Sequence, residues 1–341
     1  MSAIRLGLMG FGRIGRNVFR LLHGNDELEV VAVADIADPA ALTYLLKYDS
    51  LYGRFPGELE YADGVLRYDS RDVVFTDFRT PADTRWDDLG VDVVLDTTSR
   101  YRSRAALQGH LDSGARRVIL TSSPETPGEI PLLLRGINDE VLDDQPPVVA
   151  LGSNTSNAAA PILATLNEAF GLERAFITTV KAMSNAGRLA DVPTDSFRTS
   201  RAAGENIIPA ETNSAEIITQ VLTELEGKLV VTALNVPVVD GSTVDMVAQV
   251  GREVTVEEVN EVVREATESR YRGVIAYVED PIVSSDVRMD PHSGIFDSLA
   301  TMVTGGDMVK TITWFNNGWG YSNRAVEVAQ VVAGQLVGEP A

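Results

Sequence analysis

Three glycines near the N-terminus have the spacing of a loop that holds a dinucleotide. Gly10, Gly12 and Gly15 follow an apolar stretch and precede residues at helical spacing. In such a loop the first glycine makes the turn, the second lets backbone approach a pyrophosphate, and the third allows close helix packing. Asp35 follows Gly15 by 20 residues, where a carboxylate binds the ribose hydroxyls of NAD and repels the 2′-phosphate of NADP. The pattern predicts NAD as the cofactor, held by Gly10, Phe11, Gly12, Arg13, Ile14, Gly15 and Asp35.

Composition excludes several other kinds of chemistry. The 341 residues include no cysteine, which rules out disulfides, thiolate metal sites and a thiol nucleophile. The 3 histidines show no metal-ligand spacing, so no metal site is predicted. A formal charge of −20 disfavours nucleic acid and anionic membranes as partners. With no membrane-length apolar run and no signal-peptide pattern, we expect a cytoplasmic protein whose partner is a small-molecule substrate.

Short apolar runs alternate with helical patterns through the first 150 residues. Strands are predicted around Ile4 to Leu8 and over 30–34, 91–95, 117–121 and 148–151, with a helix over residues 14–22. Strands separated by helices in this way predict a doubly wound parallel sheet.

The second half has longer strands and a different order of elements. Helices are predicted over 156–170, 214–225, from the capping box Thr255-x-x-Glu258 onward, and over 322–336. Strands are predicted over 175–183, 229–239 and 243–250. This arrangement predicts an α+β domain that follows the parallel sheet.

Several long motifs make the sequence resemble the glyceraldehyde-3-phosphate dehydrogenase family along almost its whole length. These motifs span residues 10–16, 44–50, 53–57, 201–209, 283–286, 290–293 and 319–324. The resemblance implies a Rossmann NAD-binding domain of residues 1–152 and 318–341, a catalytic domain of residues 153–317, and a homotetramer. It also implies that Asn317 holds the nicotinamide carboxamide, that Tyr321 lies near the ring, and that Thr98 and Ser122 contact the cofactor.

The active centre departs from the family pattern at two positions. The family's Ser-Cys-Thr-Thr-Asn segment corresponds to residues 153–157 here, so Asn154 stands where the family has its nucleophilic cysteine. Lys181 stands where the family has its catalytic histidine. Burial would lower the pKa of this lysine and allow it to act as an acid/base, although a solvated amine without a function is the alternative. We expect Lys181 and Asn154 to be the catalytic residues.

The substrate-binding positions have also changed. Asn235 and Thr199 stand where the family has arginines, which removes two partners that a phosphoryl group prefers. The remaining pocket is expected to be polar and neutral. Its predicted substrate-binding residues are Ser153, Thr155, Ser184, Arg201, Thr212 and Asn235.

These observations lead to a prediction of function. We expect an NAD-dependent oxidoreductase that transfers hydride directly to or from a small alcohol, carbonyl compound or imine, with Lys181 as the acid/base. Without a thiolate, phosphorylating aldehyde oxidation is expected to be absent. Two alternatives stay open: a non-catalytic NAD-binding protein with a regulatory or structural role, and an isomerase or epimerase that uses bound NAD without net redox change.

Overall fold

The computed structural model describes residues 3–185 and 187–338, and within these the chain forms two compact units. The predicted first domain also includes residues 1–2 and 339–341, which lie outside the described residues. The first unit comprises the described parts of Met1–Leu133, Asn138–Gly152 and Ser322–Ala341. The second unit comprises the described parts of Leu134–Ile137 and Ser153–Tyr321.

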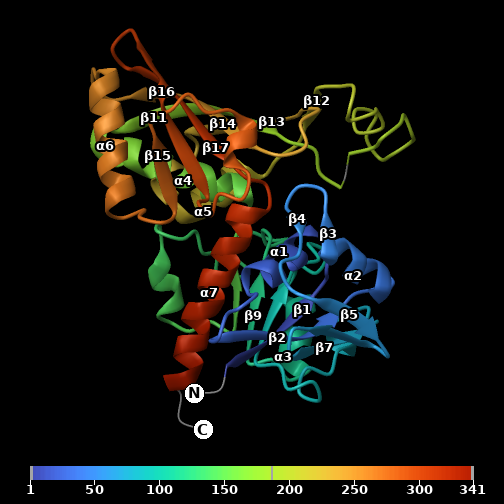
Figure 1. Ribbon diagram of the computed structural model, residues 1–341. Coiled ribbons are helices and arrows are strands. Elements are labelled where there is room, and N and C mark those ends of the chain that lie inside the picture. The colour runs from blue at the N-terminus through green and yellow to red at the C-terminus, as the bar shows by residue number, and fades with distance from the viewer. Residues whose placement is uncertain (1–2, 186, 339–341) are drawn as a thin grey trace. The chain divides into compact units, whose positions relative to one another are not determined.

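The first unit is built on an eight-stranded sheet in the order β10-β9-β8-β1-β2-β7-β6-β5 (Figure 1). The strands are β1 (Ile4–Met9), β2 (Leu28–Ala34), β5 (Leu59–Ala62), β6 (Val65–Tyr68), β7 (Arg71–Thr76), β8 (Val93–Asp96), β9 (Arg117–Leu120) and β10 (Val148–Ala150). The helices are α1 (Arg13–Leu21), α2 (Pro39–Lys47) and α3 (Arg104–Asp112), and a short hairpin joins β3 (Tyr48–Asp49) to β4 (Gly53–Arg54).

The order of strands in this sheet explains where its functional loops gather. The central strand β1 pairs in parallel with β2 and with β8, so the carboxyl ends of all three meet at one edge. The apolar, β-branched runs that predicted these strands are buried, as a parallel sheet covered on both faces requires. The antiparallel extension β5–β6–β7 was not predicted, because its short segments carry weak periodic patterns.

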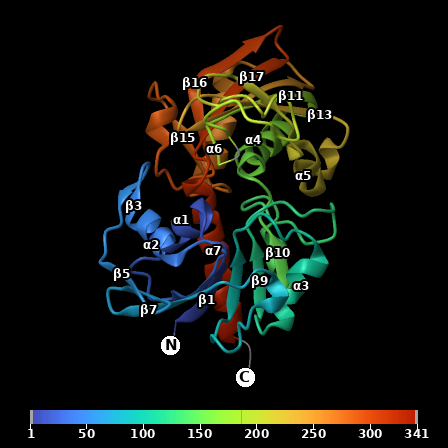
Figure 2. The ribbon, with the colours of Figure 1, turned by 90° about the vertical axis from the view of Figure 1, so that its right-hand side faces the viewer.

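The second unit contains a seven-stranded sheet in the order β12-β13-β11-β14-β17-β16-β15. Its strands are β11 (Leu172–Lys181), β12 (Ile208–Ala210), β13 (Leu229–Asn235), β14 (Ser242–Val250), β15 (Ile275–Val278), β16 (Gly294–Thr304) and β17 (Met308–Phe315). The helices α4 (Asn154–Phe170), α5 (Ser214–Val221) and α6 (Val256–Glu268) lie against the sheet (Figures 1 and 2). Apolar side chains of these helices and of the strands form one buried core beneath them.

Some predicted boundaries in this unit differ from the observed ones. Helix α4 begins at Asn154, two residues before the predicted start, and ends before Gly171, whose φ of 71° stops the helix. Strand β13 ends at Asn235 instead of 239, since Pro237 has no amide hydrogen to donate to a neighbouring strand. The long antiparallel pair β16 and β17 was not predicted.

The last helix, α7 (Trp319–Gly338), begins three residues earlier than predicted. The side chain of Asn316 explains this start, because its Oδ1 accepts hydrogen bonds from the backbone amides of Gly318 and Trp319. From Ser322 onward the helix belongs to the first unit, where Gln335 Nε2 donates to the carbonyl of Leu142 at 2.7 Å.

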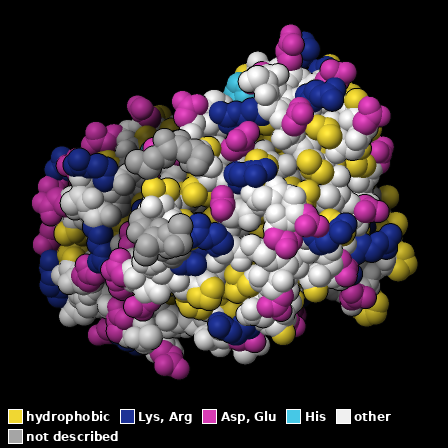
Figure 3. Space-filling view, turned by 90° about the horizontal axis from the view of Figure 1, so that it is seen from below, with side chains coloured by type: hydrophobic (Ala, Val, Ile, Leu, Met, Phe, Trp, Pro, Cys, Tyr) yellow, Lys and Arg dark blue, Asp and Glu magenta, His cyan; other side chains and the backbone are white. Residues whose placement is uncertain are grey.

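The two sheets confirm the predicted fold class, a Rossmann-type domain combined with an α+β domain. Acidic side chains are scattered among lysine and arginine side chains on the face shown in Figure 3; over the whole sequence the formal charge is −20. Among the described helices, none has the length and apolar character needed to span a membrane.

Candidate cofactor and substrate sites

The glycine loop lies at the carboxyl end of β1, against the end of β8. Gly10 has a φ of 90°, and a Cβ at this position would lie 2.9 Å from Thr98 Cγ2. Thr97 Oγ1 donates a hydrogen bond to the carbonyl of Gly10 at 2.7 Å. A Cβ on Gly15 would lie 2.4 Å from that same carbonyl oxygen, so α1 packs directly on the turn. The first and third glycines are therefore required by the fold of the loop itself.

The second glycine has a different surrounding. Within the part of the chain that the structure describes, a Cβ on Gly12 would meet no atom within 4 Å, and no side chain caps the N-terminus of α1 that follows it. An open position in front of uncapped helix amides suits an anion such as a pyrophosphate. Ser122 Oγ, in the loop after β9, is buried and has no hydrogen-bond partner within the described part of the chain. These features fit the phosphate groups of NAD.

Asp35 lies at the carboxyl end of β2, beside the glycine loop. One carboxylate oxygen, Oδ2, accepts a hydrogen bond from the Phe11 amide at 2.6 Å, and the other accepts one from the Ala37 amide at 2.9 Å. The carboxylate is thus held at a fixed place next to the turn. Its position and charge fit recognition of the ribose hydroxyls of NAD.

In the second unit, the start of α4 satisfies its own backbone amides. Ser153 and Ser156 form a capping box, in which Ser153 Oγ accepts from the Ser156 amide and Ser156 Oγ accepts from the Ser153 amide. The Thr155 amide donates to Asn154 Oδ1 at 2.9 Å. Thr155 itself is fully buried, and its hydroxyl has no partner among the described residues.

A hydrogen-bond network joins this helix start to three other elements. Asn154 Nδ2 donates to the carbonyl of Asn317 at 3.1 Å, and Asn317 Oδ1 accepts from the hydroxyl of Ser242. Ser242 Oγ in turn accepts from the amide of Ala182 at 2.9 Å. Asn154 and Asn317, which were predicted separately, are therefore brought together. Sequence reasoning missed Ser242, because a single serine at the start of a strand carries no recognisable signal.

Lys181 is the last residue of β11, next to this network. It lies in register with Asn235 of β13, so two predicted site residues are neighbours on adjacent strands. Two positions back along the same face of β11, Thr179 is fully buried and its hydroxyl has no partner within the described chain. Lys181 is half-buried, and this burial lowers the pKa of its amine.

Other predicted substrate residues have partners of their own. Arg201 Nε lies 3.1 Å from Asp191 Oδ2 in an exposed loop, and Thr212 Oγ1 lies 2.8 Å from Ser214 Oγ. Within the described residues, no hydrogen bond or ion pair joins Arg201 or Thr212 to Lys181. Ser184 follows the end of β11 by three residues. Arg201 and Thr212 are thus placed in the same unit as Lys181 but not in direct contact with it.

Tyr321 is buried in the first turn of α7, and burial raises the pKa of its phenol. The phenol therefore stays protonated at any ordinary pH.

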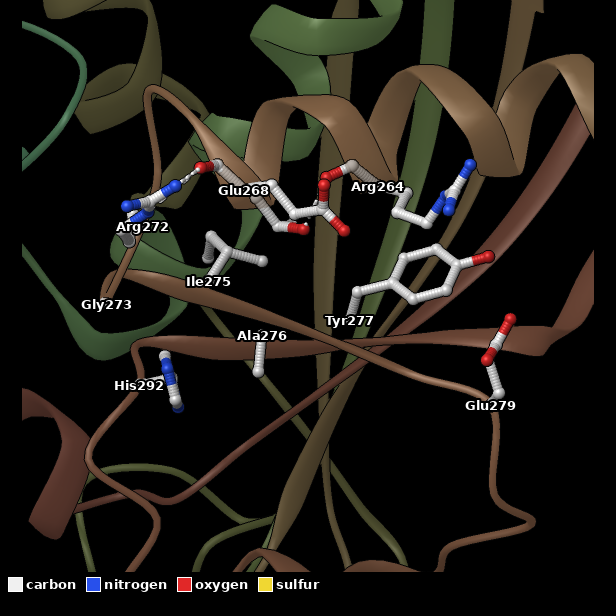
Figure 4. A pocket seen from close by; sticks show the side chains of 10 residues that line it. Arg264, Glu268, Arg272, Gly273, Ile275, Ala276, Tyr277, Glu279 and His292 are labelled. Atoms are coloured by element: carbon white, nitrogen blue, oxygen red, sulfur yellow. Dashed lines mark hydrogen bonds between the residues drawn. The ribbon is translucent and has the colours of Figure 1, made fainter.

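A separate hollow of about 580 Å³ lies between α6 and β15. Its walls include Arg264, Glu268, Tyr277 and His292, as Figure 4 shows. None of the predicted cofactor, catalytic or substrate residues lines it. Among the residues that the structure describes, no group of three or more His, Asp or Glu side chains is arranged to hold a metal ion.

Comparison with known proteins gives consistent matches along the whole chain. Residues 4–104 match the family described as glyceraldehyde 3-phosphate dehydrogenase, NAD binding domain, and residues 153–317 match its C-terminal domain. The chain is 41% identical to the glyceraldehyde-3-phosphate dehydrogenase of Priestia megaterium, over 97% of this chain and 98% of that protein. It is 41% identical to glyceraldehyde-3-phosphate dehydrogenase 2 of Streptomyces avermitilis over 98% and 99%, and 40% identical to the Geobacillus stearothermophilus protein over 97% and 98%.

These relatives correct the predicted function. The sequence predicted hydride transfer on an alcohol, carbonyl compound or imine in place of the family's aldehyde oxidation, or else a non-catalytic or redox-neutral role. Full-length relatives at 40–41% identity, all named glyceraldehyde-3-phosphate dehydrogenase, contradict that prediction. The prediction gave two substituted positions, Asn154 and Lys181, more weight than the similarity of the whole chain.

Proposed function

Because the chain belongs to the glyceraldehyde-3-phosphate dehydrogenase family, we propose that it oxidises glyceraldehyde 3-phosphate with NAD. Members of this family are NAD-dependent oxidoreductases, and NAD is the cofactor of the matched domain. The observation that carries the proposal is 41% identity to an enzyme of this name over 97% of the chain. The glycine loop with its open position at Gly12 supports the same conclusion.

The residues that would hold NAD are those of the glycine loop together with Asp35. The α1 amides and Gly12 would bind the pyrophosphate, Asp35 the ribose, and Thr98 and Ser122 the edge of the cofactor. Asn317 and Tyr321 are proposed for the nicotinamide. When bound, NAD supplies the acceptor for the hydride that leaves the substrate.

The substrate chemistry must use groups other than a thiol, because the sequence contains no cysteine. Oxidation of an aldehyde requires a nucleophile to add to the carbonyl carbon before hydride can leave. Here water or inorganic phosphate from solution is that nucleophile, and the adduct carries a new hydroxyl group. The neutral amine of Lys181 takes the proton of this hydroxyl as the carbon loses hydride and the carbonyl forms again. The lowered pKa of Lys181 increases the fraction of amine that is able to accept a proton.

Asn154 is proposed to hold the substrate oxygen. Its amide nitrogen carries two hydrogens, of which one is donated to the carbonyl of Asn317. The second can be donated to the oxygen of the aldehyde. The Thr155 and Ser156 amides are already occupied by side chains, so the Asn154 side chain is the donor at this helix start that we assign to the substrate. Ser153, Ser184, Arg201, Thr212 and Asn235 are proposed to contact the rest of the substrate, and Thr155, whose side chain is fully buried, is proposed to act only through the helix start that holds Asn154.

The test is formation of NADH from glyceraldehyde 3-phosphate and NAD, with and without inorganic phosphate, with products identified by phosphorus NMR. Iodoacetamide provides the control. It inactivates contaminating enzymes of the host that use a cysteine, but it cannot alkylate a cysteine in this chain. Activity that survives alkylation supports the proposal. The absence of NADH from folded, NAD-saturated protein, or activity that alkylation abolishes, would contradict it.

We also propose a cytoplasmic homotetramer. One face of the sheet in the second unit carries exposed apolar side chains, among them Phe176 at 61% and Val230 at 50% exposure, on the neighbouring strands β11 and β13. An exposed apolar sheet face is typical of a contact between subunits. Light scattering should give the mass of four chains, and Phe176→Asp should reduce it. A wild-type protein that stays monomeric at micromolar concentration would contradict this assembly.

A further inference from the structure

Three fully buried polar side chains form a chain beneath the glycine loop of the first unit. Trp86 precedes β8, His110 lies on α3, and Asp96 is the last residue of β8; each is 0% exposed. Trp86 Nε1 lies 2.9 Å from His110 Nδ1, and His110 Nε2 lies 3.3 Å from Asp96 Oδ2. Polar groups this deeply buried are costly to place unless each has a partner.

The direction of these hydrogen bonds follows from the chemistry of the three groups. The indole nitrogen of Trp86 carries a hydrogen and can only donate, so His110 Nδ1 must accept. The proton of the neutral imidazole is therefore on Nε2, which donates it to the carboxylate of Asp96. Trp86 thus favours the tautomer of His110 that carries its proton on Nε2, and this tautomer is the one that can donate to Asp96.

The carboxylate of Asp96 connects His110 to one loop of the cofactor site, and the backbone carbonyl of Asp96 separately holds a second loop. Its other carboxylate oxygen, Oδ1, accepts from the amide of Thr98 at 2.9 Å and from the hydroxyl of Thr98 at 2.7 Å. Its backbone carbonyl accepts from both the amide and the hydroxyl of Thr121, each at 3.0 Å. Thr98 lies against Gly10, and Thr121 precedes Ser122. Both loops contain residues that we propose to contact NAD.

We propose that Asp96 and His110 are positioning residues for NAD, which fix Thr98 against the glycine loop. Both side chains are fully buried, so they act through Thr98 and do not touch the cofactor. The carboxylate accepts the two hydrogen bonds of Thr98 on one oxygen and that of His110 on the other. Without the hydrogen bond from His110, Oδ2 loses the donor that keeps the carboxylate turned toward Thr98, and the loop after β8 is no longer held in one conformation.

The experiment compares two substitutions of His110, each of which keeps one of the two hydrogen bonds of the imidazole ring. In His110→Gln the side-chain amide reaches the position of Nε2 and can donate to Asp96. In His110→Asn the shorter amide reaches the position of Nδ1, so it accepts from Trp86 but does not reach Asp96. We expect His110→Asn to weaken NAD binding about tenfold and His110→Gln by less than about threefold. Calorimetry gives the Kd for NAD, and thermal unfolding without NAD gives stability.

A purely structural role would lower the unfolding temperature of both variants and leave the Kd of the folded protein for NAD unchanged. That result would overturn the proposal.

A double-mutant cycle with Thr98→Val provides the second measurement. If His110 acts through Thr98, the two substitutions together weaken NAD binding by less than the product of their separate effects. Fully multiplicative effects would overturn the proposal.

If His110→Asn does not fold, Trp86→Phe provides a second variant that tests the same proposal. Phenylalanine preserves an aromatic ring at this position but removes the donor that sets the tautomer of His110. We expect about threefold weaker NAD binding, because the imidazole then divides between two tautomers of which one holds Asp96. Unchanged affinity in this folded variant would overturn the proposal.

Discussion

The cofactor side and the substrate side of this protein differ in how their residues are brought together. In the first unit, the glycine loop, Asp35 and Thr98 follow three strands whose parallel pairing places their ends at one edge of the sheet. In the second unit, Asn154 and Asn317 meet although 163 residues separate them in the sequence. A site built on neighbouring strand ends is visible as a local motif, whereas a site built by distant segments becomes visible only in the folded chain.

The two sides also differ in their unused polar groups. Asp35 has partners for both carboxylate oxygens, and the remaining opening of the loop is the space at Gly12. On the substrate side, the hydroxyls of Thr155 and Thr179 have no partner among the described residues, but both side chains are fully buried and present no surface to a ligand. One hydrogen of the Asn154 amide is donated to Asn317, and the other has no acceptor among the residues that the structure describes. The cofactor side thus offers a shaped space, and the substrate side offers the Asn154 amide as a hydrogen-bond donor.

Substitution of Lys181 should produce the largest effect. It should lower turnover, which depends on the substrate side, without changing NAD binding, which depends on the cofactor side. We expect Lys181→Met to reduce turnover of glyceraldehyde 3-phosphate by about 10²- to 10⁴-fold, the usual contribution of a general base. The Kd for NAD should change little, since Lys181 is not among the residues that we propose to hold the cofactor. Steady-state kinetics and calorimetry measure the two quantities. Lys47→Met, which removes a lysine on α2, is the matched control, and equal losses in both variants would contradict the assignment.

The glycine loop allows a second comparison, between Gly12 and Gly15. A Cβ at Gly12 meets no atom of the described residues within 4 Å, so Gly12→Val should fold with normal stability but weaken NAD binding by about 10- to 100-fold, as overpacking does. A side chain at Gly15 lies 2.4 Å from the Gly10 carbonyl oxygen, so Gly15→Ala should lower the unfolding temperature itself. Titration with NAD and thermal unfolding distinguish the two variants. Normal NAD binding by Gly12→Val would show that the pyrophosphate lies elsewhere.

Asp35 should have a smaller effect, on the choice of cofactor. We expect Asp35→Ala to weaken NAD binding about tenfold through loss of a charged hydrogen-bond acceptor. The binding of NADP should weaken less or improve, because the carboxylate that repels the 2′-phosphate is gone. The ratio of the two Kd values measures this change. A ratio equal to that of the wild type would remove Asp35 from ribose recognition.

The smallest expected effect concerns pH. Burial lowers the pKa of Lys181 in the folded protein below its ordinary value of 10.5, so the unfolded chain binds this proton more readily at intermediate pH. Stability should therefore rise with pH between the folded and the unfolded pKa of Lys181, and turnover should rise as the amine loses its proton. Lys181→Met removes the charge that burial disfavours, so it should weaken this dependence and stabilise the protein by up to about 1 kcal/mol below that range. Chemical denaturation at several pH values measures the difference, and identical pH profiles would contradict it.

Elements with strong local patterns were predicted well from the sequence. The apolar runs at β1, β2, β9 and β10 were recognised, and the capping box of α6 was found at Thr255 and Glu258. The antiparallel strands β16 and β17 were missed. Burial alternates along β17, but its buried positions include Thr311 and Thr313, so the sequence shows no clear apolar and polar alternation. Strand β16 begins with five buried residues in a row and therefore has no alternating pattern at its start either.

The sequence by itself determined the glycine loop, the carboxylate of Asp35, the absence of a thiol and the resemblance to one family. These features depend on the residue types and on spacings of a few residues, which fix backbone conformation and local hydrogen bonds. Tertiary structure alone decided that Ser242 links Ala182 to Asn317, that Lys181 is partly desolvated, and that His110 holds Asp96 beneath the cofactor loop. Burial and contacts between distant segments arise from the packing of a whole unit, and no short stretch of sequence contains them.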